Sequence, residues 1–359
     1  MLRFGQPASG GATFSVAELG NIGLNDKGDA AVAFSLEPLQ FDPFVNGGVY
    51  RYSHKTQALT PVVLPGTPAP GGGTFVGLDF GLSLNNHGAI AFSGEVGQPD
   101  NPVRGAYVAD RKGHITTLAS VETPGPGGGT FSRASNPSLN NEGDVAFSGR
   151  LSTVTNRVRS VYLREAETGK IVAIANAGDP APGGGELVTT GHPRINDRGD
   201  VAFLGFFAFD PTTVFNPTGL FLHHRHALTR IAGPGDLMPG GGHVTFISEL
   251  DWNVGLNNHG ELAFCTGLDN NEEGLYTYSK GAIHLVARTG TVIRGVGTIF
   301  SLEMGNPIVP GSPPAAAGWP TSGSQLNDRG QAVFGCTLTD GRGALLLATP
   351  TEEEEDEEE

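Results

Sequence analysis

The residues best placed to do chemistry are polar side chains that recur just before each copy of a short asparagine motif. They combine acids, arginines, carboxamides, a histidine and a tryptophan, and they form the candidate ligand-binding set: Glu18, Asn21, Asp79, Arg133, Asn136, His192, Arg194, Asp251, Trp252, Asn253, Glu303 and Asn306. Carboxylates near a histidine could act as acid and base on a glycosidic bond. No pair of acids can be selected from their order along the chain, so no catalytic residue is assigned. Ordered water between these groups is the simpler alternative to a ligand.

A second group with metal-binding chemistry is the trio His223, His224 and His226. Alternation along a strand places His224 and His226 on one face. A zinc site needs further ligands from elsewhere in the chain. We therefore favour an exposed strand end and assign no metal.

Two recurrent loops resemble ion-binding loops but are better explained as structure. The asparagine motif offers side-chain oxygens, yet a calcium loop gathers six to eight of them, and three of the six copies have Asn-Asn with no acid in that pair. The loops Pro70–Gly73, Pro126–Gly129, Pro182–Gly185 and Pro239–Gly242 lack the Gly-Lys-Ser/Thr ending and the helix of a phosphate-binding loop. We predict that the asparagine motifs form turns and that the Pro-Gly-Gly-Gly loops provide backbone clearance between repeats. We predict no cofactor.

The asparagine motif reveals an internal repeat. Its six copies are Leu24–Gly28, Leu84–Gly88, Leu139–Gly143, Ile195–Gly199, Leu256–Gly260 and Leu326–Gly330, with asparagines 60, 55, 56, 61 and 70 residues apart. Asn-Asp/Asn-x-Gly is hairpin-turn chemistry. An alternating strand follows, as in Asp144–Ser148, where Val145 and Phe147 share one face.

Each repeat predicts four strands, which indicates the fold. Third strands are expected near residues 48–50, 105–107, 160–162, 219–221, 274–276 and 343–345, and fourth strands as at 115–119 and 171–175. Six such units predict an all-β, six-bladed β-propeller. The last unit ends at its third strand, so we expect residues 2–7 to supply the missing strand and close the ring. Residues 1–350 would then form a single domain, followed by a disordered acidic tail at 351–359.

Charge and composition exclude several function classes. The net charge of −15 includes eight acidic residues at 352–359, which leaves 29 acids against 22 bases, or −7, for the body. No basic stripe is present, which argues against nucleic-acid binding. No apolar run approaches the ~20 residues of a membrane span, and the first residues lack the apolar core of a signal peptide. Cys265 and Cys336 are expected to be buried free thiols, and a monomer is expected.

The Asn-x-x-Gly-x-x-x-Phe spacing of five copies, for example Asn140–Phe147, resembles that of the choice-of-anchor tandem repeat NxxGxxxF-containing proteins of bacteria. The resemblance covers nearly the whole chain. It implies an extracellular or cell-surface protein, although this chain shows neither a leader nor an anchor. It implies no catalytic residue.

Two functions remain open at this level. The first is a non-enzymatic binding module for a glycan or a protein, because no repeat departs from the others with a reactive cluster. The alternative is a propeller hydrolase or lyase that acts on a polysaccharide through the first-strand acids and His192. Insertions at 206–215 and 307–320 break the symmetry and could carry contacts. The Asp-box of sialidases is absent.

Overall fold

The computed structural model describes residues 22–35, 47–98, 101–154, 158–208, 216–247, 254–302 and 325–350 of the 359-residue chain. Every regular element among these residues is a β-strand, and all strand pairs are antiparallel. The strands form six sheets, numbered here 1 to 6 in chain order. No helix capable of crossing a bilayer occurs in this part of the chain.

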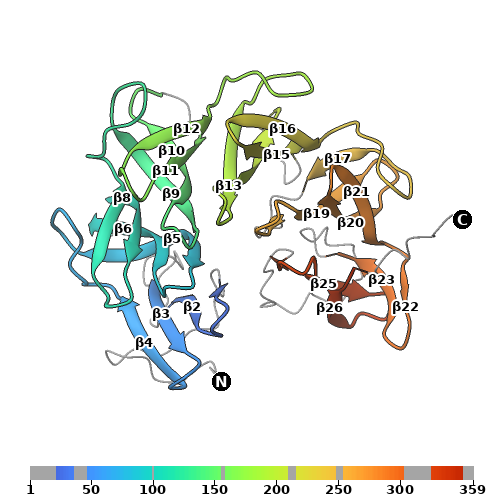
Figure 1. Cartoon of the computed structure of the whole chain (residues 1–359), viewed down its shortest axis with the longest axis horizontal. Helices are drawn as coiled ribbons and strands as arrows, with labels where there is room; N and C mark the ends of the chain where they lie inside the picture. Colours follow the sequence, from blue (N-terminus) through green and yellow to red (C-terminus); the bar gives the residue numbers. More distant parts are fainter. Residues whose placement is uncertain are drawn as a thin grey trace, which may run out of the picture. The chain divides into compact units, whose positions relative to one another are not determined.

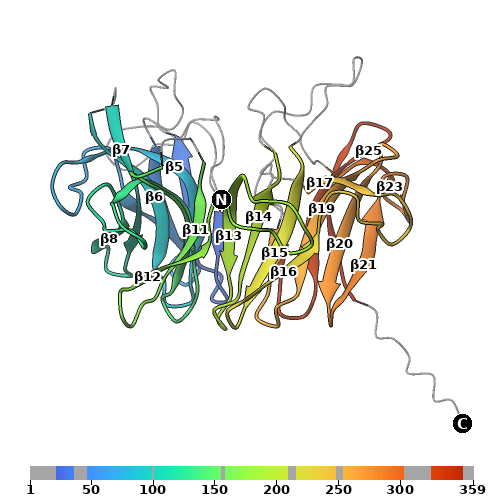
Figure 2. The same ribbon diagram turned by 90° about the horizontal axis from the view of Figure 1, so that it is seen from above.

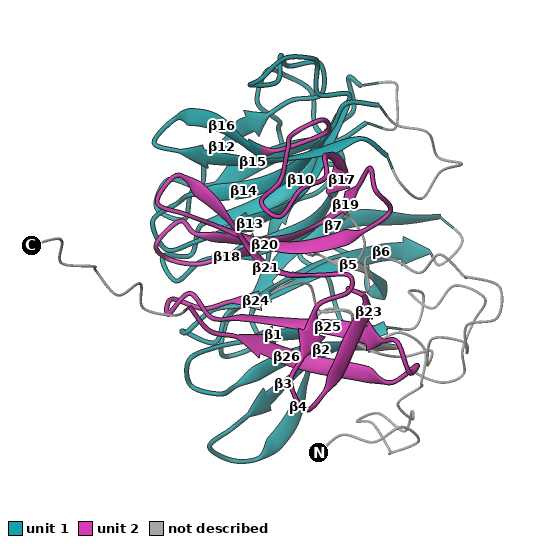
Figure 3. Ribbon diagram, turned by 90° about the vertical axis from the view of Figure 1, so that its right-hand side faces the viewer, with its two compact units in different colours: residues 1–231, 316–320 teal, residues 232–315, 321–359 magenta. Residues whose placement is uncertain are grey.

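The chain divides into two compact units, coloured separately in Figure 3, and unit 1 comprises residues 1–231 with 316–320. Its sheets follow one another in chain order (Figure 1), and the first strand of each contacts the first strand of the next. Sheet 1 contains β1 (Ile22–Leu24), β2 (Ala30–Ser35), β3 (Gly47–Ser53) and β4 (Ala58–Val63). Sheet 2 contains β5 (Phe75–Leu84), β6 (Ile90–Gln98), β7 (Asn101–Ala109) and β8 (Ile115–Ala119). Sheet 3 contains β9 (Phe131–Leu139), β10 (Val145–Leu151), β11 (Ser160–Arg164) and β12 (Ile171–Ala175), and sheet 4 contains β13 (Thr189–Ile195), β14 (Val201–Phe206), β15 (Thr218–His224) and β16 (Ala227–Ala232).

Unit 2 comprises residues 232–315 and 321–359 and holds sheets 5 and 6. Sheet 5 contains β17 (Val244–Ile247), β18 (Val254–Leu256), β19 (Leu262–Leu268), β20 (Glu273–Ser279) and β21 (Ala282–Arg288). Figure 2 shows β19, β20 and β21 next to one another. Sheet 6 contains β22 (Val292–Ile293), β23 (Gly297–Ser301), β24 (Gln325–Leu326), β25 (Ala332–Leu338) and β26 (Gly343–Ala348). Both β17 and β18 pair with β19, so they are two pieces of one first strand, and β23 and β24 have the same relation to β25.

The second strand of sheets 2 to 5 carries the motif phenylalanine and is buried on both faces along most of its length, whereas buried and half-buried residues alternate in β25 of sheet 6. In β10, Val145 and Phe147 pack with Ala91 and Ala106 of sheet 2. The alternate residue Ala146 packs with the core that sheet 3 shares with sheet 4. Alternation is therefore present as predicted, but both faces are buried because each inner sheet of unit 1 lies between two others.

A repeated group of aromatic rings fills these cores. In sheet 3 the ring centroids of Phe131 and Tyr162 lie 5.0 Å apart at 86°, and those of Phe131 and Phe147 lie 5.5 Å apart. The equivalent rings of sheet 2 repeat the edge-to-face contact at 5.0 Å and 79°. Such contacts add about 0.5–1.5 kcal/mol to the gain from burial. The Thr-Phe, motif Phe and third-strand Tyr of the repeat thus form one packing unit.

The Pro-Gly-Gly-Gly loops are tight turns, and their glycines are explained by backbone conformation. Gly127, Gly128 and Gly129 have φ of 83°, 106° and 73°, a region that side chains other than glycine rarely adopt. A Cβ at Gly127 or Gly128 would meet no atom of the described residues within 4 Å. The prediction that the glycines of these loops provide clearance between repeats is therefore wrong at Gly127 and Gly128, whereas a Cβ at the equivalent Gly183 would lie 2.8 Å from Arg230 Nη1 of the next sheet.

Several predictions about the chain are confirmed and others fall outside the described residues. Cys265 and Cys336 are buried and free, and burial, with Glu273 nearby, raises the pKa of the Cys265 thiol to about 12.

Sheet 6 stops at its third strand position, and β26 pairs with β25 alone among the residues described. Residues 2–7, the acidic tail and most of both insertions lie outside the description. The described part of the structure thus does not show a closed ring, and one domain over 1–350 stays a prediction.

Candidate functional site

The motif asparagine holds its own turn and also binds the next sheet. Asn85 is buried, and its Oδ1 accepts hydrogen bonds from the backbone N–H groups of His87 (3.0 Å) and Ala89 (2.9 Å). Its Nδ2 donates to the carbonyl oxygen of Asn140, 55 residues away, at 3.1 Å. All three partners of the Asn85 side chain are backbone groups, two in its own turn and one in the next sheet, so the asparagine acts as a structural connector.

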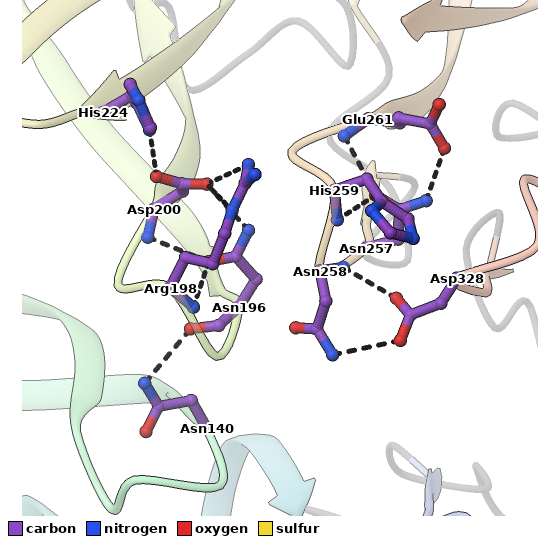
Figure 4. Close-up of polar contacts among 10 residues, drawn as sticks. All are labelled: Asn140, Asn196, Arg198, Asp200, His224, Asn257, Asn258, His259, Glu261 and Asp328. Carbon is purple, nitrogen blue, oxygen red and sulfur yellow. Dashed lines mark hydrogen bonds and ion pairs between the residues drawn. The ribbon is translucent and has the colours of Figure 1, made fainter.

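The same connection recurs through both units. In unit 1, Asn25 donates to the Asn85 carbonyl at 3.2 Å and Asn140 to the Asn196 carbonyl at 3.1 Å. In unit 2, Asn257 donates to the Asn327 carbonyl at 3.0 Å. Figure 4 shows the Asn140–Asn196 contact of unit 1.

The residue after the motif asparagine adds a second link. The backbone N–H of Asn141 donates to Asp197 Oδ1 at 2.7 Å in unit 1. That of Asn258 donates to Asp328 Oδ1 at 2.8 Å in unit 2 (Figure 4). The predicted turn-forming role of these residues is confirmed. Their link between sheets was not predicted, because turn chemistry alone accounts for an Asn-x-x-Gly sequence.

The acid four residues after the motif asparagine joins two turns of one sheet. Asp200 is buried, and its carboxylate accepts hydrogen bonds from Asn196 Nδ2 (2.9 Å), Arg198 Nη2 (2.8 Å) and His224 Nδ1 (Figure 4). Burial alone would raise the pKa of Asp200, but these hydrogen bonds outweigh it and hold the pKa below its usual value. Asp144, at the same place in sheet 3, accepts the backbone N–H of Ala166 at 2.8 Å. This acid is a structural clamp.

His224 and His226 do not share one face as alternation predicted, although they lie at the end of the strand and in its turn as expected. Arg225 and His226 have φ of 48° and 67°, so they form the two-residue turn between β15 and β16 and interrupt the strand. His224 pairs with Asp200, whereas the His226 ring contacts the His223 ring at 6.3 Å. The part of the chain that the structure describes contains no group of three or more His, Cys, Asp or Glu side chains able to hold a metal ion.

The first-strand candidates separate into two sets. Seven lie outside the described residues: Glu18, Asn21, Asp251, Trp252, Asn253, Glu303 and Asn306. Asp79 lies within β5, and its side chain is likewise outside the description. Arg133 and Asn136 on β9 and His192 and Arg194 on β13 are described, and they lie on neighbouring first strands of unit 1.

A backbone irregularity marks the same position in three first strands. Gly81, Asn136 and His192 each lie four residues before the motif asparagine, and their φ values are 108°, 57° and 55°. The pairing register shifts at each of these places, between Leu78 and Leu82 in β5 and likewise in β9 and β13. Such bulges often lie beside functional sites. The recurrence of Gly, Asn and His at this offset was a usable signal, because these residues tolerate positive φ better than most.

Buried polar atoms gather at the β9 irregularity. Asn136 is 3% exposed, and its backbone N–H donates to Ser93 Oγ of sheet 2 at 3.0 Å. Its side-chain Oδ1, together with the Oγ atoms of Ser135 and Ser148, is buried and has no hydrogen-bond partner among the described residues. Buried polar groups are nearly always hydrogen-bonded. These three atoms therefore indicate a place where a ligand or water can bind.

The surroundings of His192 are positively charged. Burial, and then the charges of Arg159 and Arg194, lower the pKa of His192 to about 3, and burial lowers the pKa of Arg194 to about 10. His192 is therefore neutral at physiological pH, while both arginines are charged. Because a general base works best with a pKa near the operating pH, His192 is poorly suited to that role.

Arg159 reaches β13 from the loop before β11. Its backbone N–H donates to Thr189 Oγ1 at 2.8 Å, and its carbonyl accepts the N–H of Thr190 at 2.9 Å. These bonds hold sheet 3 against the first strand of sheet 4, close to His192. Sequence reasoning missed Arg159, Ser135 and Ser148, since a loop arginine and small hydroxyl residues in strands are common without function.

Comparison with known proteins gives a family and a fold. A family model described as "Family of unknown function (DUF7453)" matches residues 1–348. None of the curated proteins matches the sequence. Two peptidase structures resemble the chain. The first is an acylaminoacyl peptidase in complex with Z-Gly-Gly-Phe-chloromethyl ketone, with a TM-score of 0.51, 10% identity and coverage of 92% of this chain and 43% of that chain. The second is the Pyrococcus horikoshii acylaminoacyl peptidase, with a TM-score of 0.50, 10% identity and coverage of 94% of this chain and 45% of that chain.

The chain spans less than half the length of both peptidases. At these identities the likeness concerns the fold alone. The β-propeller domain of the trilobed protease from Pyrococcus furiosus is also among the similar structures, with a TM-score of 0.49, 9% identity and coverage of 95% of this chain and 82% of that chain.

Proposed function

Because this chain belongs to the DUF7453 family, whose function is unknown, we propose a function from its own fold and site. The protein is a non-enzymatic β-propeller of six blades that binds a ligand at the irregular first strands of sheets 3 and 4. The buried polar atoms of Ser135, Asn136 and Ser148, which have no hydrogen-bond partner among the residues that the structure describes, are the observation that carries this proposal.

The closed ring is part of the proposal, and the edge of sheet 6 supports it. Beyond the strand that carries the motif phenylalanine, sheets 1 to 5 each have two more strands, whereas sheet 6 has β26 alone among the described residues. On its outer strand β26, Leu345 and Leu347 are 70% and 59% exposed. An exposed apolar edge strand invites pairing with another strand. Residues 2–7 are the proposed partner.

Hydrogen exchange tests the closure. If residues 2–7 pair with β26, the β26 amides that do not bond to β25 are protected in the full chain and lose protection when residues 2–7 are deleted. Rapid exchange of these amides in the full chain would show that the edge is open and would contradict the closure.

A binding role fits the site better than catalysis does. The site lies on strands held by hydrogen bonds between sheets, and its histidine stays neutral. Rigid positioning of a few convergent polar groups is what ligand recognition requires. We propose a glycan or protein ligand and a monomeric, secreted or cell-surface protein. Detection of the chain in the cytosol of its native host, and not outside it, would refute the location.

A binding screen tests the function. Purified protein is titrated with glycans and envelope proteins, and the hits are repeated with Asn136→Gly. This variant removes the side chain but tolerates a φ of 57°. We expect at least a tenfold loss of affinity, about 1.4 kcal/mol.

Asn271→Gly is the matched control, because Asn271 also has a positive φ of 61° but lies in an exposed turn of unit 2. It should bind as the wild type does. No binder at millimolar concentration, or equal loss in both variants, would refute the proposal. Turnover of a polysaccharide that survives in Asn136→Gly would favour the enzymatic alternative.

A further inference from the structure

Gly191 lies at the edge of the β13 bulge, and neither its backbone angle nor packing among the described residues requires a glycine there. It lies in β13 just before His192, and its φ is not positive. At Gly94, Gly149 and Gly205, a Cβ would come within 2.6–2.7 Å of a packed side chain. A Cβ at Gly191 would meet only ordinary contacts, so alanine would fit there. Glycine inside a strand marks a bulge or the close approach of a ligand or another backbone, and the bulge beside Gly191 does not by itself exclude a Cβ.

Two donors lie beside the missing Cβ of Gly191. The position a Cβ would take is 3.8 Å from Ser148 Oγ and 4.0 Å from Arg159 Nη2. Ser148 is fully buried, and its hydroxyl has no partner among the described residues. Ser135 is directly paired with Ser148 in the sheet, so its hydroxyl is on the same face. A ligand oxygen packed on Gly191 would lie within reach of Ser148 and Arg159.

The charge of this place selects the ligand's chemistry. Arg159 and Arg194 are the charged groups that act on His192 at this site. Both arginines are part-buried, which keeps them within reach of solvent while reducing screening by water. The planar guanidinium matches a carboxylate with two parallel hydrogen bonds.

We propose that the ligand of this site carries a carboxylate, which docks on Gly191 between the Ser148 hydroxyl and the Arg159 guanidinium. This inference rests on the proposed binding function and specifies its ligand as an acidic sugar, such as a uronic acid residue. The carboxylate would accept hydrogen bonds from Ser148 and Arg159, and Arg194 would add favourable charge.

The experiment compares acidic and neutral sugars of the same stereochemistry. Galacturonate, oligogalacturonides, galactose and galacto-oligosaccharides are titrated by calorimetry into the full chain at two salt concentrations. We expect the acidic members to bind at least tenfold more tightly, and more weakly at high salt. Free galacturonate and the oligomers separate a small-acid ligand from a polysaccharide.

Two variants test the site by different routes. Gly191→Ala adds a methyl group at ordinary contact distance, so it should fold normally and lose at least tenfold in affinity for the acidic sugar. Arg159→Gln should lose the preference for the acidic over the neutral sugar. Lys112→Gln, on an exposed turn of unit 1, makes the same charge change and should bind as the wild type does.

The outcomes distinguish this inference from the function on which it rests. Equal binding of acidic and neutral sugars, or wild-type affinity in Gly191→Ala, would overturn the carboxylate site. A neutral ligand or a protein whose binding is lost in Asn136→Gly would overturn it too, while leaving the binding function standing. If nothing in the wider panel binds, both fail.

Discussion

Replacing Asn85 with aspartate tests whether Asn85 only forms its turn or also connects two sheets. Aspartate keeps the Oδ1 that accepts the His87 and Ala89 N–H groups, so a residue needed only for its turn should tolerate the change. It loses the Nδ2 that donates to the Asn140 carbonyl at 3.1 Å. A carboxylate oxygen would then face a carbonyl oxygen in the interior.

The expected cost follows from two contributions. The lost hydrogen bond is worth about 1 kcal/mol. Asn85 is 6% exposed, so the new charge is buried opposite an acceptor, which adds about 1–3 kcal/mol. Asn85→Asp should therefore lower the free energy of unfolding by about 2–4 kcal/mol at neutral pH. The deficit should shrink as the pH falls toward about 4, because a neutral carboxyl group can donate.

Asp110→Asn is the matched control for this measurement. Asp110 Oδ1 accepts the N–H groups of Lys112 (2.8 Å) and His114 (2.9 Å), the same turn geometry as Asn85. The substitution Asp110→Asn should change the free energy of unfolding by no more than about 0.5 kcal/mol. Equilibrium urea unfolding compares the two variants with the wild type. Equal, small effects in both would refute the connector role.

Three further predictions concern the core and its titratable groups. Phe147→Ala removes a fully buried ring and should cost about 3–5 kcal/mol, read as a lower urea midpoint; a loss below 1 kcal/mol would contradict the packing described. The lowered pKa of Asp200 means that its stabilisation is present above the unfolded-state pKa of about 4 and is lost as the pH falls through the folded-state value. The acid-induced loss of stability should accordingly be smaller in Asp200→Asn than in the wild type, and an unchanged pH profile would show that the clamp contributes nothing. Cys265 and Cys336 should both resist a thiol reagent at pH 8 in the folded protein and react in urea, whereas fast reaction without urea would contradict their burial.

The strands of each repeat could be predicted because their signals are local. Alternating apolar residues and Asn-x-x-Gly turns place β10 and its equivalents correctly, and the shared spacing extends this to six sheets. The link from Asn85 to Asn140 could not be predicted, since it joins residues 55 positions apart and leaves no trace beyond the repeat itself. The shared face predicted for His224 and His226 was wrong because Arg225 and His226 form a two-residue turn without the Asn-Gly signal of such turns.

About half of the described site was visible in the sequence. Arg133, Asn136, His192 and Arg194 were expected from their place in first strands. The bulges were not expected, because an extra residue in a strand leaves the alternation pattern looking like an ordinary irregularity. Gly191 was hidden for a different reason. Its meaning depends on the space around its α-carbon, which no residue pattern encodes.

Imidazole NMR spectra test the binding site most directly. The chain has ten histidines, and the signal of His192 can be assigned by its absence in His192→Asn, a change that tolerates the φ of 55°. Saturation with a ligand found in the screen should shift the His192 signal and leave those of exposed histidines such as His114 in place. Saturable binding that leaves the His192 signal unchanged would place the ligand elsewhere and contradict the account.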